Sequence, residues 1–156
     1  MKVLLAHEHR DSNHAMQIAR RLERNDVEAY LSAVDTFTDL GSAPLSESIR
    51  NEMSQCSQLI VVVSAAAAFS WWIPLEIGIA MEKAYPIVSF ALDNGSLPDY
   101  LRKWPYLQRL NEIDEYCAEA KRTYWPSFIQ ASYIVGANAR CGAEQFHRDL
   151  KLRLGQ

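Results

Sequence analysis

The stretch LIVVVSAAAAFSWWIPLEIGIAMEKAYPIVSFAL, residues 59–92, contains a strand, a helix and a second strand in succession. Residues 59–63 are apolar without interruption and rich in β-branched side chains, which is typical of a strand buried on both faces. Apolar residues then recur at helical spacing: Ile73, Ile77, Ala80, Met81 and Ala84. A second apolar run follows at residues 87–92. This order predicts two parallel strands joined by a helix that covers the sheet.

The same alternation extends upstream of this unit. Residues 3–6 and 27–31 are predicted strands, and residues 32–44 are a loop in which Asp, Thr, Gly, Ser and Pro gather without periodicity. One helix is predicted between the two strands, from an apolar stripe at Ala15, Ile18, Ala19 and Leu22. A second is predicted between the loop and residue 59, from a stripe at Leu45, Ile49, Met53 and Cys56. We therefore predict an α/β fold, a flavodoxin-like doubly wound parallel sheet of about five strands, with ligands beyond the carboxyl ends of the strands.

The pattern is weaker downstream of the unit. Residues 97–104 and 113–121 are predicted to be helical, residues 133–135 to form a fifth short strand, and residues 143–154 to form a closing helix. We expect a single domain over residues 1–156, with a core at 2–104 plus the closing helix and an extended segment at 105–142.

Charge and composition exclude several classes of protein. The 156 residues include 16 Lys and Arg against 19 Asp and Glu, so no basic excess exists from which a nucleic-acid or membrane-surface site could be built. The longest apolar run, residues 59–69, is too short to span a membrane, and the first apolar run is too short for a signal peptide. Three widely spaced cysteines suggest neither a disulfide framework nor a zinc site. We expect a cytoplasmic protein that begins at Met1.

Motifs of several common enzymes are missing. The sequence has no GxxxxGK[ST] loop, no GxGxxG after the first strand and no GxSxG elbow. Ser64 ends the third strand, where a phosphoacceptor of the receiver type would need an Asp. Cys117 and Cys141 have no obvious activating neighbour, which favours structural thiols.

Glu76 is the unusual residue in the third predicted helix. It stands four positions after Trp72, so the carboxylate and the indole share one helix face, where the acid is partly desolvated. Such an acid can hydrogen-bond a hydroxyl or stabilise a cation. The alternative is that Glu76 is favoured only by the dipole at the helix start, supported by Pro74 nearby, and that the tryptophans belong to the core.

A polar cluster follows the first strand, at the same predicted edge of the sheet. His7 and His9 flank Glu8, but two histidines two residues apart in a loop are a weak metal signal. We expect no metal and favour a loop that hydrogen-bonds a polar ligand. Asp11, Ser12 or Asn13 is available as the N-cap of the helix that follows.

With these elements laid out, the chain resembles a bacterial Toll/interleukin-1 receptor (TIR) domain, of the stand-alone type that consumes NAD. The resemblance covers residues 2–104 and the last helix. It rests on the first strand and loop, with Ala6-His7 and Asp11, and on an apolar strand ending in Ser followed by S-x-W-x-x-x-E, here Ser70, Trp72 and Glu76. Two departures are Ala6, where many members have Ser, and a longer segment after residue 104.

The resemblance implies that Glu76 is the catalytic residue for cleaving the nicotinamide–ribose bond of NAD, which is a substrate, so no cofactor is expected. Residues 32–44 would be the BB loop. The substrate-binding residues would be Ala6, His7, Glu8, Asp35, Phe37, Ser70 and Trp72, with Leu40 also in that loop. Members of the catalytic branch complete the site between two protomers, which implies self-association.

The resemblance also implies a signal derived from ADP-ribose that acts on a separate effector in antiphage defence. Two other functions stay open. The chain could be a non-catalytic TIR interaction module, which would turn over no NAD. It could also be an enzyme similar to nucleoside deoxyribosyltransferases, which would exchange bases on deoxynucleosides.

Overall fold

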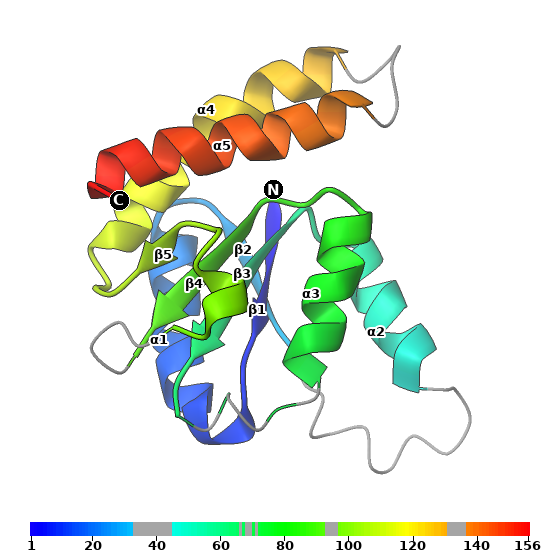
Figure 1. Cartoon of the computed structure of the whole chain (residues 1–156), viewed down its shortest axis with the longest axis vertical. Coiled ribbons are helices and arrows are strands. Elements are labelled where there is room, and N and C mark those ends of the chain that lie inside the picture. Colours follow the sequence, from blue (N-terminus) through cyan, green and yellow to red (C-terminus); the bar gives the residue numbers. More distant parts are fainter. Residues whose placement is uncertain (33–44, 66, 68–69, 71, 93–96, 131–136) are drawn as a thin grey trace.

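A computed structural model describes residues 1–32, 45–65, 67, 70, 72–92, 97–130 and 137–156. Its centre is a parallel five-stranded sheet in the order β2-β1-β3-β4-β5 (Figure 1). The strands are β1 Lys2–Ala6, β2 Glu28–Leu31, β3 Gln58–Val63, β4 Ile87–Ala91 and β5 Tyr106–Leu107. This sheet confirms the predicted flavodoxin-like doubly wound class.

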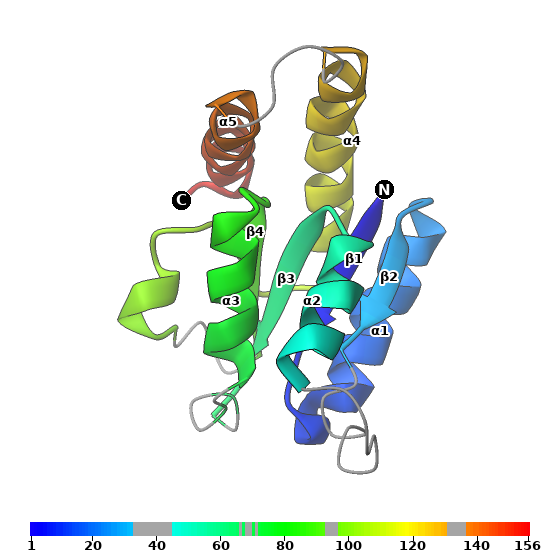
Figure 2. The same cartoon turned by 90° about the vertical axis from the view of Figure 1, so that its right-hand side faces the viewer.

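Helices cover both faces of the sheet (Figure 2). They are α1 Ser12–Arg24, α2 Leu45–Ser54, α3 Trp72–Glu82, α4 Glu112–Gln130 and α5 Ala137–Leu154, with single 3₁₀ turns at His9–Asp11 and Asp99–Leu101. One apolar cluster joins α1, α4 and α5 to one face, and a second joins α2 and α3 to the other. None of the helices in the described part of the chain is long and apolar enough to cross a membrane.

The central strands owe their place to their composition. Every residue of β3 and of β4 is buried, because each strand packs against a helix layer on both sides. Along β3, Leu59 and Val61 contact the α2–α3 cluster, while Ile60 and Val62 contact the other. The uninterrupted apolar run at 59–63 thus has a direct structural reason.

The strand order fixes where a ligand site is expected. β1 lies between β2 and β3, so the chain turns in opposite directions on leaving β1 and on leaving β3. Crevices form at such a switch point, beyond the carboxyl ends of the strands. Ser32 follows β2, His7 follows β1 and Ser64 follows β3, so all three lie at that edge.

The second half of the chain departs from the sequence prediction. The fifth strand of the sheet is Tyr106–Leu107, and the strand predicted at 133–135 lies outside the described residues. The segment 97–104 contains only a 3₁₀ turn at Asp99–Leu101. The helix predicted at 113–121 is α4, which continues to Gln130, and the closing helix already begins at Ala137.

Helices α4 and α5 pack side by side as a hairpin across the sheet (Figures 1 and 2). Ion pairs join them: Arg153 Nε lies 3.0 Å from Glu119 Oε2, and Arg122 pairs with both Glu119 and Asp149. Tyr116 and Phe146 meet edge to face with ring centroids 5.8 Å apart. The hairpin is therefore held by both apolar and ionic contacts.

Candidate active site

Glu76 is the fifth residue of α3 and lies on the face of that helix that packs against the sheet. The same face buries Ile73, Ile77 and Ala80. The glutamate is only 2% exposed, although a carboxylate is rarely buried without a charged partner. Trp72, one turn earlier, is partly buried against the apolar cluster that joins α2 and α3 to the sheet, so it is not wholly a core residue. The structure therefore places the acid inside the fold.

The hydrogen-bond partner of Glu76 comes from another element. Ser32 Oγ donates to Glu76 Oε1 over 2.5 Å, and Ser32 is itself 5% exposed. The serine directly follows β2, and its backbone N–H donates to the Leu5 carbonyl of β1 at 3.1 Å. Helix α3 is thus tied to the ends of the first two strands.

Burial raises the pKa of Glu76 to about 7, since taking the carboxylate out of water disfavours its charged form. The Ser32 hydroxyl acts in the opposite direction, and the negative charges of Glu52 and Glu8 add to the increase. Burial also raises the pKa of Glu52, whose carboxylate accepts a hydrogen bond from Tyr30. No lysine or arginine of the described residues forms an ion pair with Glu76.

A second serine–carboxylate pair lies at the same edge of the sheet. Ser64 Oγ, after β3, donates to Asp11 Oδ2 over 2.6 Å, and Asp11 is 6% exposed. The same hydroxyl accepts a hydrogen bond from the Ala67 N–H at 3.3 Å. Asp11 is the N-cap residue of α1, but its side chain makes no capping hydrogen bond. The carboxylate links the two loops at the switch point instead.

The other residues predicted for the site have diverse positions. His7 Nδ1 lies 3.1 Å from the Leu5 carbonyl, which orients the ring, and Glu8 is near enough for its charge to act on Glu76. Ala6 is the last residue of β1 and is fully buried. Ser70 Oγ accepts from the Ile73 N–H at 3.5 Å, at the start of α3. The predicted residues Asp35, Phe37 and Leu40 lie outside the described residues.

Ser32 was not identified by the sequence analysis. The only signal in the sequence is its place directly after a strand, at the carboxyl edge where function is expected. Serine is common in such loops, so this signal is weak. The fold brings Ser32 to Glu76 across 44 positions of sequence.

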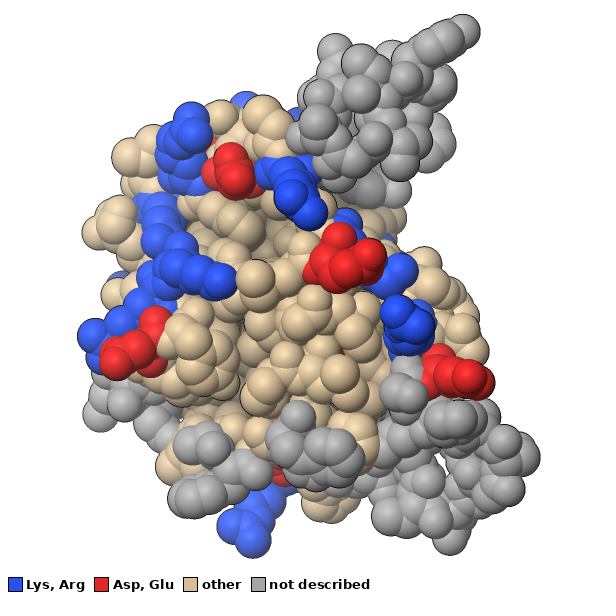
Figure 3. All heavy atoms as spheres, turned by 45° about the vertical axis from the view of Figure 1, so that its right-hand side comes forward, with Lys and Arg blue, Asp and Glu red and all other residues tan. Residues whose placement is uncertain are grey.

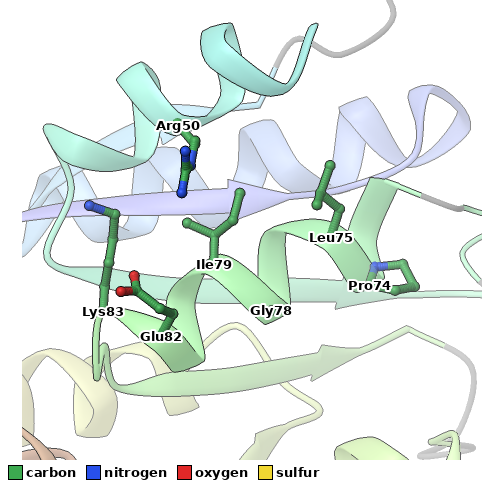
Figure 4. Close-up of a pocket in the computed structure, with 7 residues that line it drawn as sticks. All are labelled: Arg50, Pro74, Leu75, Gly78, Ile79, Glu82 and Lys83. Carbon is green, nitrogen blue, oxygen red and sulfur yellow. The ribbon is translucent and has the colours of Figure 1, made fainter.

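Two pockets lie elsewhere on the molecule. One, of about 380 Å³, lies between α2 and α3 and is lined by Arg50, Pro74, Leu75, Gly78, Ile79, Glu82 and Lys83 (Figure 4). The other, of about 200 Å³, is lined by His14, Gln17, Ile18, Phe90, Leu92, Gln108 and Leu110. Glu76, which is 2% exposed, lines neither of these two pockets.

Other chemistries have little support in the described part of the chain. No three His, Cys, Asp or Glu side chains come together there in a way that could hold a metal ion. Burial raises the pKa of the Cys56 thiol to about 11 and that of Cys117 to about 12, which makes both poor nucleophiles at neutral pH. The face drawn in Figure 3 carries charges of both signs interspersed.

Comparison with known proteins supplies one strong match. The family model of the TIR domain matches residues 3–122, a range that includes Glu76, Ser32 and Asp11. No curated protein matches the chain. Among solved structures, a diflavin flavoprotein A3 from Nostoc sp. is 15% identical, with a TM-score of 0.44, and the alignment covers 99% of this chain and 96% of that one. A similarity at this TM-score is too weak to support an inference about this chain.

Proposed function

Because the chain belongs to the TIR domain family, we propose that it cleaves the bond between nicotinamide and ribose in NAD, with Glu76 as its catalytic residue. The observation that carries this proposal is the environment of Glu76. The carboxylate is buried at the edge of the sheet where ligands bind, and its one hydrogen bond from the described residues comes from a neutral hydroxyl. A strongly shifted acid of this kind is a candidate for a functional role.

The chemistry suits such a residue. When nicotinamide leaves, its bond to the ribose breaks, the electron pair stays with the nicotinamide nitrogen, and positive charge develops on the ribose ring. A nearby carboxylate stabilises that charge and accepts hydrogen bonds from ribose hydroxyls. The effect is larger where water is excluded, because the local dielectric constant is low. The ionised form of Glu76 is the one required, so activity should rise with pH through about 7.

The remaining steps of the proposal follow the family. The BB loop, residues 32–44, would help to form the site, and the complete site would lie between two protomers, so activity would depend on self-association. Water, an atom of the same ADP-ribose unit, or another nucleophile would then capture the ribosyl cation, which gives ADP-ribose, a cyclic isomer or a conjugate. Such a product could act as a signal to a separate effector in antiphage defence. This last step rests on analogy with the family.

The test is incubation of the pure protein with NAD at several protein concentrations, with mass spectrometry of the products. We expect free nicotinamide, and we expect Glu76→Gln to lower kcat by at least about a hundredfold, which is typical for loss of one charge-stabilising group. Glu82→Gln is the matched control, because Glu82 is an exposed residue of the same helix and should keep activity.

Three outcomes would overturn the proposal. Full activity of Glu76→Gln would remove the catalytic assignment. Absence of turnover at every concentration, with or without lysate of infected cells, would favour a TIR interaction module. Exchange of bases on deoxynucleosides without cleavage of NAD would favour an enzyme of the deoxyribosyltransferase type.

A further inference from the structure

The environment of Glu76 points to a role for a residue outside the S-x-W-x-x-x-E motif. Both the backbone and the side chain of Ser32 form hydrogen bonds. Its backbone N–H is bonded to the Leu5 carbonyl of β1 at 3.1 Å, and its hydroxyl reaches Glu76 Oε1 at 2.5 Å. Because Ser32 is 5% exposed, water cannot easily replace it as a donor. Its hydroxyl therefore has one well-defined direction.

Two other carboxylates among the described residues disfavour the charged form of Glu76. Glu8 approaches from the loop after β1, and Glu52 approaches from α2. Tyr30 of β2 donates its hydroxyl hydrogen to Glu52, so this hydrogen is not available to Glu76. Among the described residues, Ser32 supplies the one interaction that acts against burial and against these two carboxylates. A hydroxyl that donates to a carboxylate favours its ionised form.

This inference rests on the proposed function and extends it. We propose that Ser32 is the positioning residue of the site: its hydroxyl holds the Glu76 carboxylate in one orientation at the edge of the sheet and favours its charged form. Through this bond Oε1 is held, while Oε2, which accepts no hydrogen bond from the described residues, would interact with the ribose. The serine itself touches neither the substrate nor the reacting atoms.

The kinetic test compares Ser32→Ala and Ser32→Thr with the wild type over pH 5–9. Loss of the hydroxyl should lower kcat/KM for NAD about tenfold at pH 7, mostly through kcat, and should move the acid limb of the pH profile upward by about one unit. Ser32→Thr keeps the hydroxyl and should restore both. Ser64→Ala is the matched control, because it removes the other serine–carboxylate bond at this edge and should leave the acid limb in place.

A second measurement does not depend on activity. The difference in unfolding free energy between the wild type and Glu76→Gln, followed against pH, reports the titration of Glu76 alone. The same difference is then measured in a Ser32→Ala background, or in Ser32→Cys should the alanine variant not fold. We expect the pH range of the change to extend about one unit higher without the hydroxyl.

The two proposals can fail separately. If the wild type cleaves NAD and Glu76→Gln does not, while Ser32→Ala keeps the wild-type rate and pH profile, the catalytic assignment stands and Ser32 is only a structural partner. An unchanged titration of Glu76 in the Ser32→Ala background would overturn the role of Ser32 as well. If the wild type leaves NAD intact, the proposed function fails and the positioning role fails with it, whatever the titration shows.

Discussion

Among the described residues, two glutamates are almost fully buried: Glu119 in the helical hairpin and Glu76 at the edge of the sheet. Glu119 is 1% exposed, and its carboxylate accepts hydrogen bonds from Arg122, Arg153 and Thr123. Glu76 is 2% exposed and is bonded by the neutral Ser32, with two further carboxylates nearby. The two residues share a side chain and a degree of burial, and differ in what compensates the charge.

The difference separates a structural acid from a candidate functional one. A buried carboxylate with two guanidinium partners stabilises the arrangement that holds it, because removal of either side leaves a charge unpaired. A buried carboxylate without a cation makes the fold less stable whenever it is ionised. Retention of such a group is typical of sites where stability is lost in favour of function. Mutation of each glutamate should therefore have opposite effects on stability.

The largest change in the free energy of unfolding is expected in the hairpin of α4 and α5. Glu119→Gln should lower the free energy of unfolding by about 3 kcal/mol, because the buried carboxylate loses its charged hydrogen bonds to Arg122 and Arg153, which keep only their second partners, Asp149 and Glu115. Urea denaturation at pH 7 would measure it. The control on the same helix is Lys121→Gln. Lys121 Nζ lies 3.7 Å from Oδ2 of the exposed Asp26, and exposed ion pairs of this kind contribute less than about 1 kcal/mol to the free energy of unfolding. Equal effects of the two variants would contradict the structural role of Glu119.

A smaller effect of opposite sign is expected at the edge of the sheet. The folded pKa of Glu76, about 7, lies above the ordinary value of 4.5, so the folded state holds its proton more tightly. The contribution of Glu76 to the free energy of unfolding is largest below pH 4.5. It falls as the pH rises from 4.5 to 7 and is constant above pH 7. Glu76→Gln keeps the oxygen that Ser32 bonds and removes the charge. It should raise stability by about 2 kcal/mol at pH 8 and change it little at pH 4.5.

Urea denaturation of the wild type and Glu76→Gln at both pH values gives the measurement. The comparison between variants isolates this titration from others in the chain. A variant less stable than the wild type at pH 8 would mean that Glu76 has a compensating partner, and the contrast with Glu119 would be lost.

These contrasts also show what sequence alone could establish. The runs at residues 59–63 and 87–92, which are apolar apart from Ser89, predict buried strands because a strand covered on both faces is almost entirely apolar. Glu76 could be selected because it is the one charged residue in positions 72–81, four positions after Trp72. Both signals are local, so no knowledge of the fold is needed to find them.

The features that were missed depend on contacts between distant segments. Strand β5 has two residues, too few for any periodicity, and it exists because Tyr106 and Leu107 pair with Ser89 and Phe90. Ser32 is an ordinary loop serine until the sheet brings it to Glu76. Helix α4 continues through position 126, a proline, where the sequence favours an end to the helix. Tertiary packing decides each of these.

The smallest expected change in the free energy of unfolding concerns His147, a partly buried histidine of α5. Its Nε2 accepts a hydrogen bond from the Ile87 N–H at 2.9 Å and so joins α5 to the start of β4. Burial lowers the pKa of His147 to about 4, because a protonated ring would be poorly solvated there, and the positive charge of Lys151 acts in the same direction. The contribution of His147 to the free energy of unfolding is therefore fully present above pH 6.5 and is lost as the pH falls to 4. This pH dependence is opposite in direction to that of Glu76.

His147→Leu removes the acceptor and leaves the Ile87 N–H without this partner. It should lower the free energy of unfolding by about 1 kcal/mol at pH 8, with a difference that shrinks toward pH 4, where the wild-type histidine is itself disfavoured. Urea denaturation at pH 8, 6 and 4 measures this. Between pH 4.5 and 6.5 the contributions of His147 and Glu76 to the free energy of unfolding change in opposite directions, so they should largely cancel in the wild type, and the two variants reveal each slope separately. A constant loss at all three pH values would show that the hydrogen bond, and not the titration of His147, couples α5 to the sheet.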